Sequence, residues 1–462
     1  MDRALTKYGA IVFDDPSIHE GGWACIDGGT PYRIRGTIDI PDDHILWCNV
    51  EPEVMRRDGL SARFRGSDWG PLRIGEPRSQ DHWDFKSCIL SEYGISEVSA
   101  QRRAAYLAKI FGRLMQFTRA FYPSATEPLK FGLAHTLRAR RPKDIAGEMT
   151  SPVRMALEMA KTFGCAAERP PGVERFRRVG SLYPPRYDHA MQLLSQPIPA
   201  NGCRWNRLRK HEIPTDSSDI AEWVESRKPM LVQMVVESLD NPVAHQLLNP
   251  AGETIPGMGR RLWRTGEEAI AFSAFGRVRI NNAFEADASV IPIDTLPQSI
   301  REIDPVLVRS SPTLSLFFLA LQKSFMLSDV HFADKKLGYK TTPSEVFMRA
   351  RDMLLCAQWS MALHQAGFGV IWYGSSSVQI SIPDDFLEAK KTLFNAAAQC
   401  GMMTAAGTMP QGGRDILSAN SQDDNGLLRY VLLEGEVDKI FDLDDTMFEN
   451  IMDRLRAGME LS

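Results

Sequence analysis

One helix constrains the fold of this chain more than any other segment. Residues 342–367, TPSEVFMRARDMLLCAQWSMALHQAG, begin with a capping-box pattern of Thr342 and Glu345, place Pro343 at the first helical position and end at Gly367. The apolar residues run nearly all round the helix axis: Phe347, Met348, Met353, Leu354, Leu355, Trp359, Met361 and Leu363. Such a helix is buried on most sides, so other parts of the chain must surround it.

The segment after this helix predicts two strands joined by a tight turn. FGVIWY (368–373) is a short apolar run, and VQISI (378–382) alternates apolar and polar residues as a half-buried strand does. A glycine and three serines lie between them, and such a loop can hold a phosphate. A phosphate loop leads directly into a helix, however, whereas here a whole strand intervenes. Residues 374–377 are therefore interpreted as a hairpin turn.

A further helix follows the second strand. Asp385 and Glu388 have capping-box spacing, and Gly401 marks the end. A ββα unit packed on the preceding helix predicts a ferredoxin-like or related α+β module, a fold class that specifies no function.

The whole chain is predicted to be a multidomain α+β protein. Its 462 residues are enough for several domains. Short apolar runs between turns predict strands near the N-terminus, and a helix with an apolar stripe is expected before Pro123. The expected divisions are a β-rich domain (1–94), a basic helical region with a proline-rich arm (95–203), a second β-rich domain (204–310) and an α+β C-terminal domain (311–462).

Three finer expectations concern the middle of the chain. A second helix is predicted from Ser151 as the N-cap to Gly164 as the terminator. Proline punctuation over 166–203 predicts a linker or an extended arm. The best strands of the next domain are PMLVQMVVES (229–238) and EEAIAFSAFGRVRI (267–280), with a short helix in SDIAEWVES (218–226).

Charge is distributed unevenly along the sequence. The net charge is −4, but residues 101–214 hold 21 Lys or Arg against 8 Asp or Glu, a net +13. Residues 1–100 carry −6 and residues 401–462 carry −7. A basic segment in an acidic chain indicates a polyanionic partner, or a basic region docked on acidic parts of the same chain.

Three clusters carry much of this positive charge. Arginine neutralises phosphates through paired hydrogen bonds, and aromatic rings between arginines offer stacking faces for unpaired bases. Arg also outnumbers Lys by 39 to 15 in the whole chain, which would generate some clusters by itself. The predicted nucleic-acid contacts are Arg138, Arg140, Arg141 and Lys143; Arg175, Arg177, Arg178, Tyr183, Arg186 and Tyr187; and Arg204, Trp205, Arg207, Arg209 and Lys210.

One short cluster has the composition of a metal site. Asp329, His331 and Asp334 in DVHFAD could ligate Mg²⁺, Mn²⁺ or Zn²⁺, although surface residues after a helix explain the pattern equally well. The sequence shows no serine- or cysteine-nucleophile signature and no HExxH, and it indicates no particular cofactor.

The compartment is inferred from the cysteines and the apolar segments. Seven cysteines without a CxxC pair predict free thiols in a reducing, cytoplasmic setting. The apolar runs are too short to cross a membrane, which would need about 20 residues.

Three functions follow, in this order of preference. The first is a non-catalytic protein that binds DNA or RNA through the central basic region, recognising shape or single strands. The second is a subunit of a larger assembly in which acidic and basic surfaces pair between protein subunits. The third is a metal-dependent, nuclease-like phosphoryl-transfer enzyme that uses Asp329, His331 and Asp334.

Overall fold

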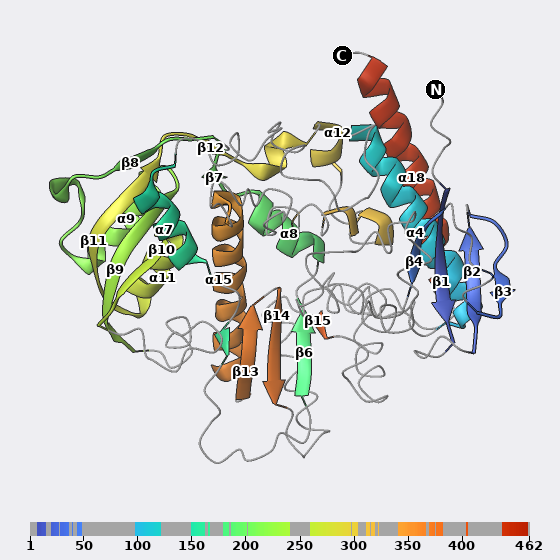
Figure 1. The fold of residues 1–462 in the computed structure, drawn as a ribbon, viewed down its shortest axis with the longest axis horizontal. Coiled ribbons are helices and arrows are strands. Elements are labelled where there is room, and N and C mark those ends of the chain that lie inside the picture. Colours follow the sequence, from blue (N-terminus) through green and yellow to red (C-terminus); the bar gives the residue numbers. More distant parts are fainter. Residues whose placement is uncertain are drawn as a thin grey trace. The chain divides into compact units, whose positions relative to one another are not determined.

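The chain folds into two compact units, each assembled from separate stretches of sequence. The computed structural model describes residues 7–14, 20–26, 28–36, 39, 44–48, 98–121, 149–161, 165–166, 179–183, 186–200, 202–240, 259–296, 298–303, 311–314, 316–318, 322, 341–365, 369–374, 376–381, 403–404 and 437–460. Unit 1 comprises Met1–Gly132, Gln298–Ser324 and Leu417–Ser462, and unit 2 comprises Leu133–Pro297 and Phe325–Ile416. Both contain helices and sheets, so the chain is an α+β protein, as predicted (Figure 1). The four domain boundaries expected from the sequence remain predictions.

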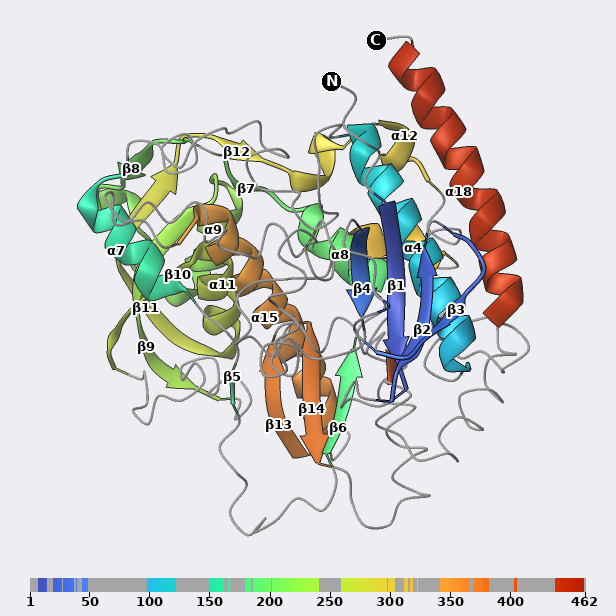
Figure 2. The ribbon, with the colours of Figure 1, turned by 45° about the vertical axis from the view of Figure 1, so that its right-hand side comes forward.

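Unit 1 contains a four-stranded sheet with a long helix across it. The strand order is β3-β2-β1-β4; β1 pairs antiparallel with β2 and parallel with β4. Helix α4 (Ala100–Phe121) packs on β1 and β2 (Figure 2). Its predicted apolar stripe is buried at Leu107, Ile110, Phe111 and Leu114. The strands are β1 (Lys7–Phe13), β2 (Gly22–Ile26), β3 (Tyr32–Ile34) and β4 (His44–Cys48).

Aromatic residues join α4 to the last helix of unit 1. Helix α18 (Val437–Glu460) packs on α4, and the short α12 (Gln298–Arg301) packs on α18. The Phe117 ring lies 5.2 Å from the Phe317 ring and 5.7 Å from the Phe448 ring, centroid to centroid. Because these rings come from three separate stretches, burying them brings the parts of unit 1 together.

Unit 2 contains a four-stranded antiparallel sheet with helices on both faces. The strand order is β10-β9-β11-β8. The inner face carries Val232, Met234 and Ile280, which belong to a core shared with α9 (Ile220–Glu225) and α11 (Gly266–Phe275). Helix α7 (Ser151–Ala160) packs on β10 and β9, whose outer face carries buried Trp263 and Leu231. The strands are β8 (Trp205–Arg207), β9 (Met230–Leu239), β10 (Arg261–Thr265) and β11 (Gly276–Ala286).

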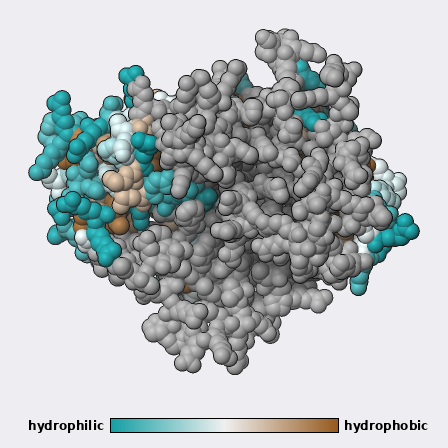
Figure 3. All heavy atoms as spheres, viewed as in Figure 1, coloured by the Kyte–Doolittle hydropathy of each residue, from teal (hydrophilic) through white to brown (hydrophobic). Residues whose placement is uncertain are grey.

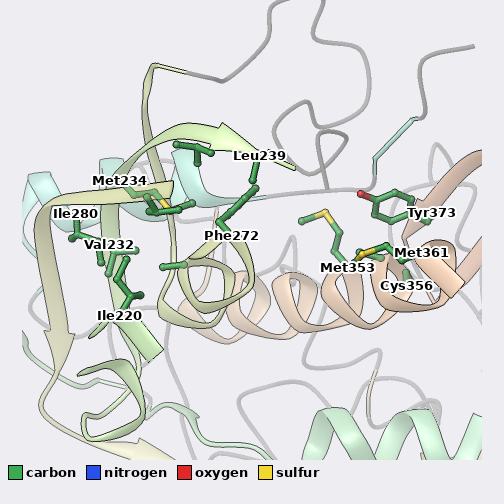
Figure 4. Close-up of a cluster of buried hydrophobic side chains, with 14 of the residues drawn as sticks. Ile220, Val232, Met234, Leu239, Phe272, Ile280, Met353, Cys356, Met361 and Tyr373 are labelled. Atoms are coloured by element: carbon green, nitrogen blue, oxygen red, sulfur yellow. The ribbon is translucent and has the colours of Figure 1, made fainter. Parts of the chain in front are cut away.

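Helix α15 (Pro343–Gln365) is the centre of unit 2, as its apolar circumference predicts. Its residues Met353, Cys356 and Met361 belong to the same hydrophobic core as the inner face of the sheet and Tyr373 of the neighbouring hairpin (Figure 4). The Thr342 hydroxyl accepts a hydrogen bond from the Glu345 amide at 3.2 Å, which confirms the predicted N-cap. Along the described helix, only Gln358, His364 and Gln365 are exposed.

The predicted hairpin is confirmed. Strands β13 (Gly369–Gly374) and β14 (Ser377–Ser381) pair antiparallel, and Ser376 in the turn has a positive φ of 60°. They belong to a five-stranded sheet of order β15-β6-β14-β13-β5, completed by β5 (Cys165–Ala166), β6 (Val179–Tyr183) and β15 (Met403–Thr404). The helix expected after Asp385 lies outside the described residues.

The structure corrects one predicted strand. The first half of EEAIAFSAFGRVRI is helix α11, and only the second half is strand β11. Thr265 and Glu268 form a complete capping box that starts this helix, and Gly276 begins the strand where a side chain would collide with the Ser238 carbonyl. The apolar residues of this segment show no clear period, so the capping box is the local signal that it begins as a helix.

Two further differences concern helix ends and the proline-rich stretch. The N-cap of α7 is Thr150 rather than Ser151, and the helix ends at Ala160, before Gly164. The stretch interpreted as a linker or arm contains strand β6 and helix α8 (Arg186–Leu194). Prolines are tolerated just before a helix, so Pro184 and Pro185 do not prevent α8 from forming.

The remaining described elements are short. They are β7 (Ile198–Pro199) paired with β12 (Ser289–Val290), and the 3₁₀ turns η3 (Lys210–Glu212), η4 (Ser217–Asp219) and η5 (Pro292–Thr295). None of the described helices is long and apolar enough to span a membrane.

Candidate functional site

Strand register gathers arginines on the outer face of the four-stranded sheet. Arg261 of β10 and Arg279 of β11 are both paired with Val235 of β9, so they flank it on the outer face. Two residues from Arg279 along β11, Arg277 pairs with Ser238, and Arg207 of β8 pairs with Phe284. We call Arg207, Arg261, Arg277 and Arg279 the arginine band; all four are exposed.

Two polar side chains contact the arginine band, Asn282 through a hydrogen bond and Glu237 through an ion pair. Arg207 Nε donates to Asn282 Oδ1 at 3.1 Å, and Arg279 Nε lies 3.3 Å from Glu237 Oε1. The Arg279 and Glu237 side chains are 60% and 39% exposed. An exposed ion pair contributes about 0–1 kcal/mol, so an incoming phosphate can displace it. In the space-filling view, hydrophilic residues predominate on the described surface of this part of unit 2 (Figure 3).

Another carboxylate lies near Arg277. The pKa of Asp216 is lowered chiefly by the hydrogen bond from the Ser218 amide, and to a smaller extent by the charge of Arg277. Asp216 is thus held as an anion by the η4 turn that it caps. Within the described residues, Glu237 and Asp216 are the carboxylates shown to interact with the four arginines.

One predicted cluster lies at this edge of the sheet. Arg204, Arg207, Arg209 and Lys210 are all exposed, and Arg207 belongs to the arginine band. Trp205 is half-buried, and its ring centroid lies 6.5 Å from that of Phe347. The stacking role expected for Trp205 remains a prediction.

The other predicted contacts are less fully described. The backbone of Tyr183 lies in β6, and those of Arg186 and Tyr187 lie in α8. Their roles remain predictions. Outside the described residues lie Arg138, Arg140, Arg141, Lys143, Arg175, Arg177 and Arg178, together with the proposed metal ligands Asp329, His331 and Asp334. Within the described ranges, no group of three His, Cys, Asp or Glu residues could hold a metal ion.

Part of the positive charge of residues 101–214 is paired within the chain. Lys109 and Arg113 of α4 both bind the carboxylate of Asp445 in α18. Lys161 Nζ lies 2.9 Å from Glu345 Oε1 at the start of α15. Docking on acidic parts of the same chain, the alternative left open by the sequence, thus accounts for these three cations.

Sequence reasoning missed three members of the arginine band. Arg261 was visible only as part of a basic stretch that enters a strand. Arg277 and Arg279 alternate with Val278 and Ile280, the period-two pattern of a strand with one polar face. That alternation was the available signal, but the pairing that places Arg261 and Arg279 on either side of β9 is not visible in the sequence.

A buried polar cluster lies between α8, α15 and the hairpin turn. Asp352 of α15 accepts hydrogen bonds from the Ser376 amide at 2.8 Å and the Ser376 hydroxyl at 2.7 Å. His189 Nε2 of α8 lies 2.7 Å from Asp352 Oδ1 and 3.0 Å from Ser376 Oγ. All three residues are at most 1% exposed.

The composition of this cluster is that of a hydrolase triad, but the geometry is different. In a Ser-His-Asp triad the histidine lies between the other two, with one ring nitrogen on each. Here a single nitrogen faces both partners, and Asp352 holds Ser376 directly. The cluster is therefore a clasp that fixes the hairpin turn to α15, not an activated nucleophile.

Comparisons with known proteins leave the family open. No family model and no curated protein matches the chain. Among solved structures, Phi29 DNA polymerase complexed with primer-template DNA is 12% identical with a TM-score of 0.35, over 63% of this chain and 53% of that chain. Phi29 DNA polymerase complexed with single-stranded DNA is 11% identical with a TM-score of 0.34. The match spans about half the length of the polymerase, and these values are too low to show a shared fold or to indicate a function.

Proposed function

We propose that this chain binds nucleic acid through phosphate contacts made by the arginine band. The observation that carries the proposal is the gathering of Arg207, Arg261, Arg277 and Arg279, all exposed, on one face of a rigid sheet. A guanidinium donates two parallel hydrogen bonds to a phosphate and keeps its charge at any physiological pH. Phosphate contacts of this kind supply most of the affinity of sequence-independent binding.

The neighbouring segment supports the same proposal. Arg209 and Lys210 follow β8 after the buried Leu208 and are exposed, so they add positive charge next to Arg207. The proposed role is non-catalytic binding in the cytoplasm; the free thiols of Cys25, Cys203 and Cys356 suit a reducing compartment. Arg175, Arg177 and Arg178 are proposed as further phosphate contacts.

The test is a binding measurement across salt concentrations. Fluorescence anisotropy with labelled single-stranded DNA, duplex DNA and RNA would compare the wild type with the triple variant Arg207→Ala, Arg277→Ala, Arg279→Ala. Each lost phosphate contact lowers the slope of log K against log[salt] by about 0.7–0.9, so the triple variant is expected to lose about two units of slope. Because the side chains are exposed, the melting temperature should stay close to that of the wild type.

A matched control is available in unit 1. Arg454 and Arg456 of α18 are also exposed arginines, and their double alanine variant should bind as the wild type does. Unchanged affinity and salt slope in the triple variant would refute the role of the arginine band. A second variant, Arg175→Ala, Arg177→Ala, Arg178→Ala, tests the sequence-derived cluster separately.

A further inference from the structure

We infer that the arginine band binds the phosphodiester backbone of double-stranded nucleic acid rather than unpaired bases. This inference rests on the proposed function and specifies the ligand of that surface. It differs from the sequence-based expectation of stacking in the central basic region, because it follows from the charges and rings that the described residues place on the outer face of the sheet.

The first reason is that the aromatic rings of this face offer little stacking surface. Trp205, two residues before Arg207 on β8, is half-buried, with its ring centroid 6.5 Å from that of Phe347. Trp263 and Phe284 lie on the outer face, but they stack on each other with centroids 5.3 Å apart and are 3% and 6% exposed. Among the described residues of unit 2, the exposed large apolar side chains are Met155 and Met159 of α7, and neither is aromatic. Proteins that bind single strands combine positive charge with exposed rings on which bases stack, a contribution of about 1–3 kcal/mol per base.

The second reason is the two-dimensional arrangement of the charges. Arg277 and Arg279 lie two residues apart on one strand, about 7 Å at 3.4 Å per residue. Arg261 lies across β9 from Arg279, two strand spacings or roughly 9.5 Å away. Arg207 adds a charge on a further strand, opposite Phe284. Phe284 in turn pairs with Leu231, four residues or about 14 Å along β9 from Val235. A single strand follows a linear track, whereas a duplex presents phosphates from two strands at about one charge per 1.7 Å of axis.

The third reason is rigidity. The band lies on paired strands, and the buried residues beneath it hold their backbone in place. A flexible single strand would have to become ordered on this surface without stacking to compensate, whereas a duplex is already ordered. The difference in ordering entropy therefore favours the duplex.

Glu237 gives the inference a second, independent readout. Its carboxylate oxygen lies 3.3 Å from Arg279 Nε, so it competes with a phosphate for that guanidinium. The variant Glu237→Gln removes that competing charge and should raise duplex affinity by about two- to fivefold, the equivalent of one exposed ion pair. A residue that merely stabilises the sheet would leave duplex affinity unchanged when replaced in this way.

The experiment measures the part of binding that depends on the band. Anisotropy titrations would use a single-stranded DNA, a duplex DNA and a duplex RNA of equal length, roughly 20 nucleotides, at the same salt concentration. Each probe is measured with the wild type, with the double variant Arg207→Ala, Arg279→Ala, and with Glu237→Gln. The double variant should lose at least tenfold in affinity for the duplexes and less than threefold for the single strand. Glu237→Gln should strengthen duplex binding.

The outcomes separate the inference from the function on which it rests. An equal or larger loss on the single strand would overturn the duplex assignment and leave nucleic-acid binding intact. No binding to any probe would overturn both. The DNA and RNA arms then identify which duplex backbone the surface prefers.

Discussion

Asp352 holds the turn residue Ser376 by two hydrogen bonds, one from its amide and one from its hydroxyl. This contact fixes a turn with a positive φ at a non-glycine residue to the central helix of unit 2. Asp352→Asn replaces one carboxylate oxygen by an NH₂ group, which would then face the hydrogen-bond donors of Ser376. We expect the free energy of unfolding to fall by about 2–4 kcal/mol, because buried polar groups lose their hydrogen-bond partners. Urea denaturation followed by circular dichroism measures this change.

Two further variants make this prediction specific. Ser376→Ala keeps the amide contact and should lose only about 1–2 kcal/mol. Gln358→Ala on the exposed side of the same helix should stay within about 0.5 kcal/mol of the wild type. If Asp352→Asn behaved like Gln358→Ala, the clasp would have no stabilising role.

The contact of α18 with α4 should depend on salt. Asp445 binds both Lys109 and Arg113, and it is 36% exposed, so solvent screens the interaction. Asp445→Asn is expected to lower stability by about 0.5–1 kcal/mol at low salt and by less at high salt. Differential scanning calorimetry at two ionic strengths measures the difference.

The control for this ion pair lies on the same helix. Asp453 is exposed, and its Oδ1 lies 3.0 Å from Nη1 of Arg456, one turn away on the same helix. Asp453→Asn should have a smaller effect at both salt concentrations. Equal effects of Asp445→Asn at low and high salt would show that packing, rather than charge, attaches α18.

Local signals made some elements predictable. Helix α15 could be recognised because its cap residues Thr342 and Glu345 and its apolar pattern are contained in one stretch of sequence. The hairpin turn at Ser376 was predictable for the same reason. Helix α11 was missed because a continuous apolar run does not distinguish a buried strand from a buried helix.

The candidate site depends on contacts that no local pattern contains. Arg207 was found because other basic residues adjoin it in the sequence. Arg261 and Arg279 lie on either side of Val235 only because β10 and β11 both pair with β9 at that residue. His189 and Asp352 are 163 residues apart, so their contact is set by the packing of α8 on α15. Such relationships require the tertiary structure.

Cys203 should be inert in the folded protein. Burial raises the pKa of its thiol to about 12, and the nearby Asp287 adds to the effect. Only the thiolate reacts with alkylating reagents, so at pH 8 we expect almost no modification until the chain is unfolded. Iodoacetamide labelling followed by peptide mass spectrometry measures the rate. Ser226→Cys places a thiol at an exposed position for comparison, and labelling of Cys203 at a similar rate would contradict the prediction.

Glu268 should make stability fall as the pH rises. Burial raises the pKa of its carboxyl, and the charge of Arg264 offsets only part of that effect. The folded protein therefore binds this proton more tightly than the unfolded chain does. The destabilisation is absent below the unfolded pKa of about 4.3 and grows until the pH exceeds the folded-state pKa.

The variant Glu268→Gln isolates this contribution because glutamine does not titrate. Its side-chain oxygen can still accept the hydrogen bond that the Thr265 amide donates to Glu268 at 2.8 Å. The melting temperature of the wild type minus that of the variant should decrease between pH 4 and pH 7. Glu222→Gln, at an exposed position of α9, serves as the control and should show little such trend. An increase of the difference with pH would mean that the ion pair with Arg264, 3.4 Å away, outweighs the cost of burying the carboxylate.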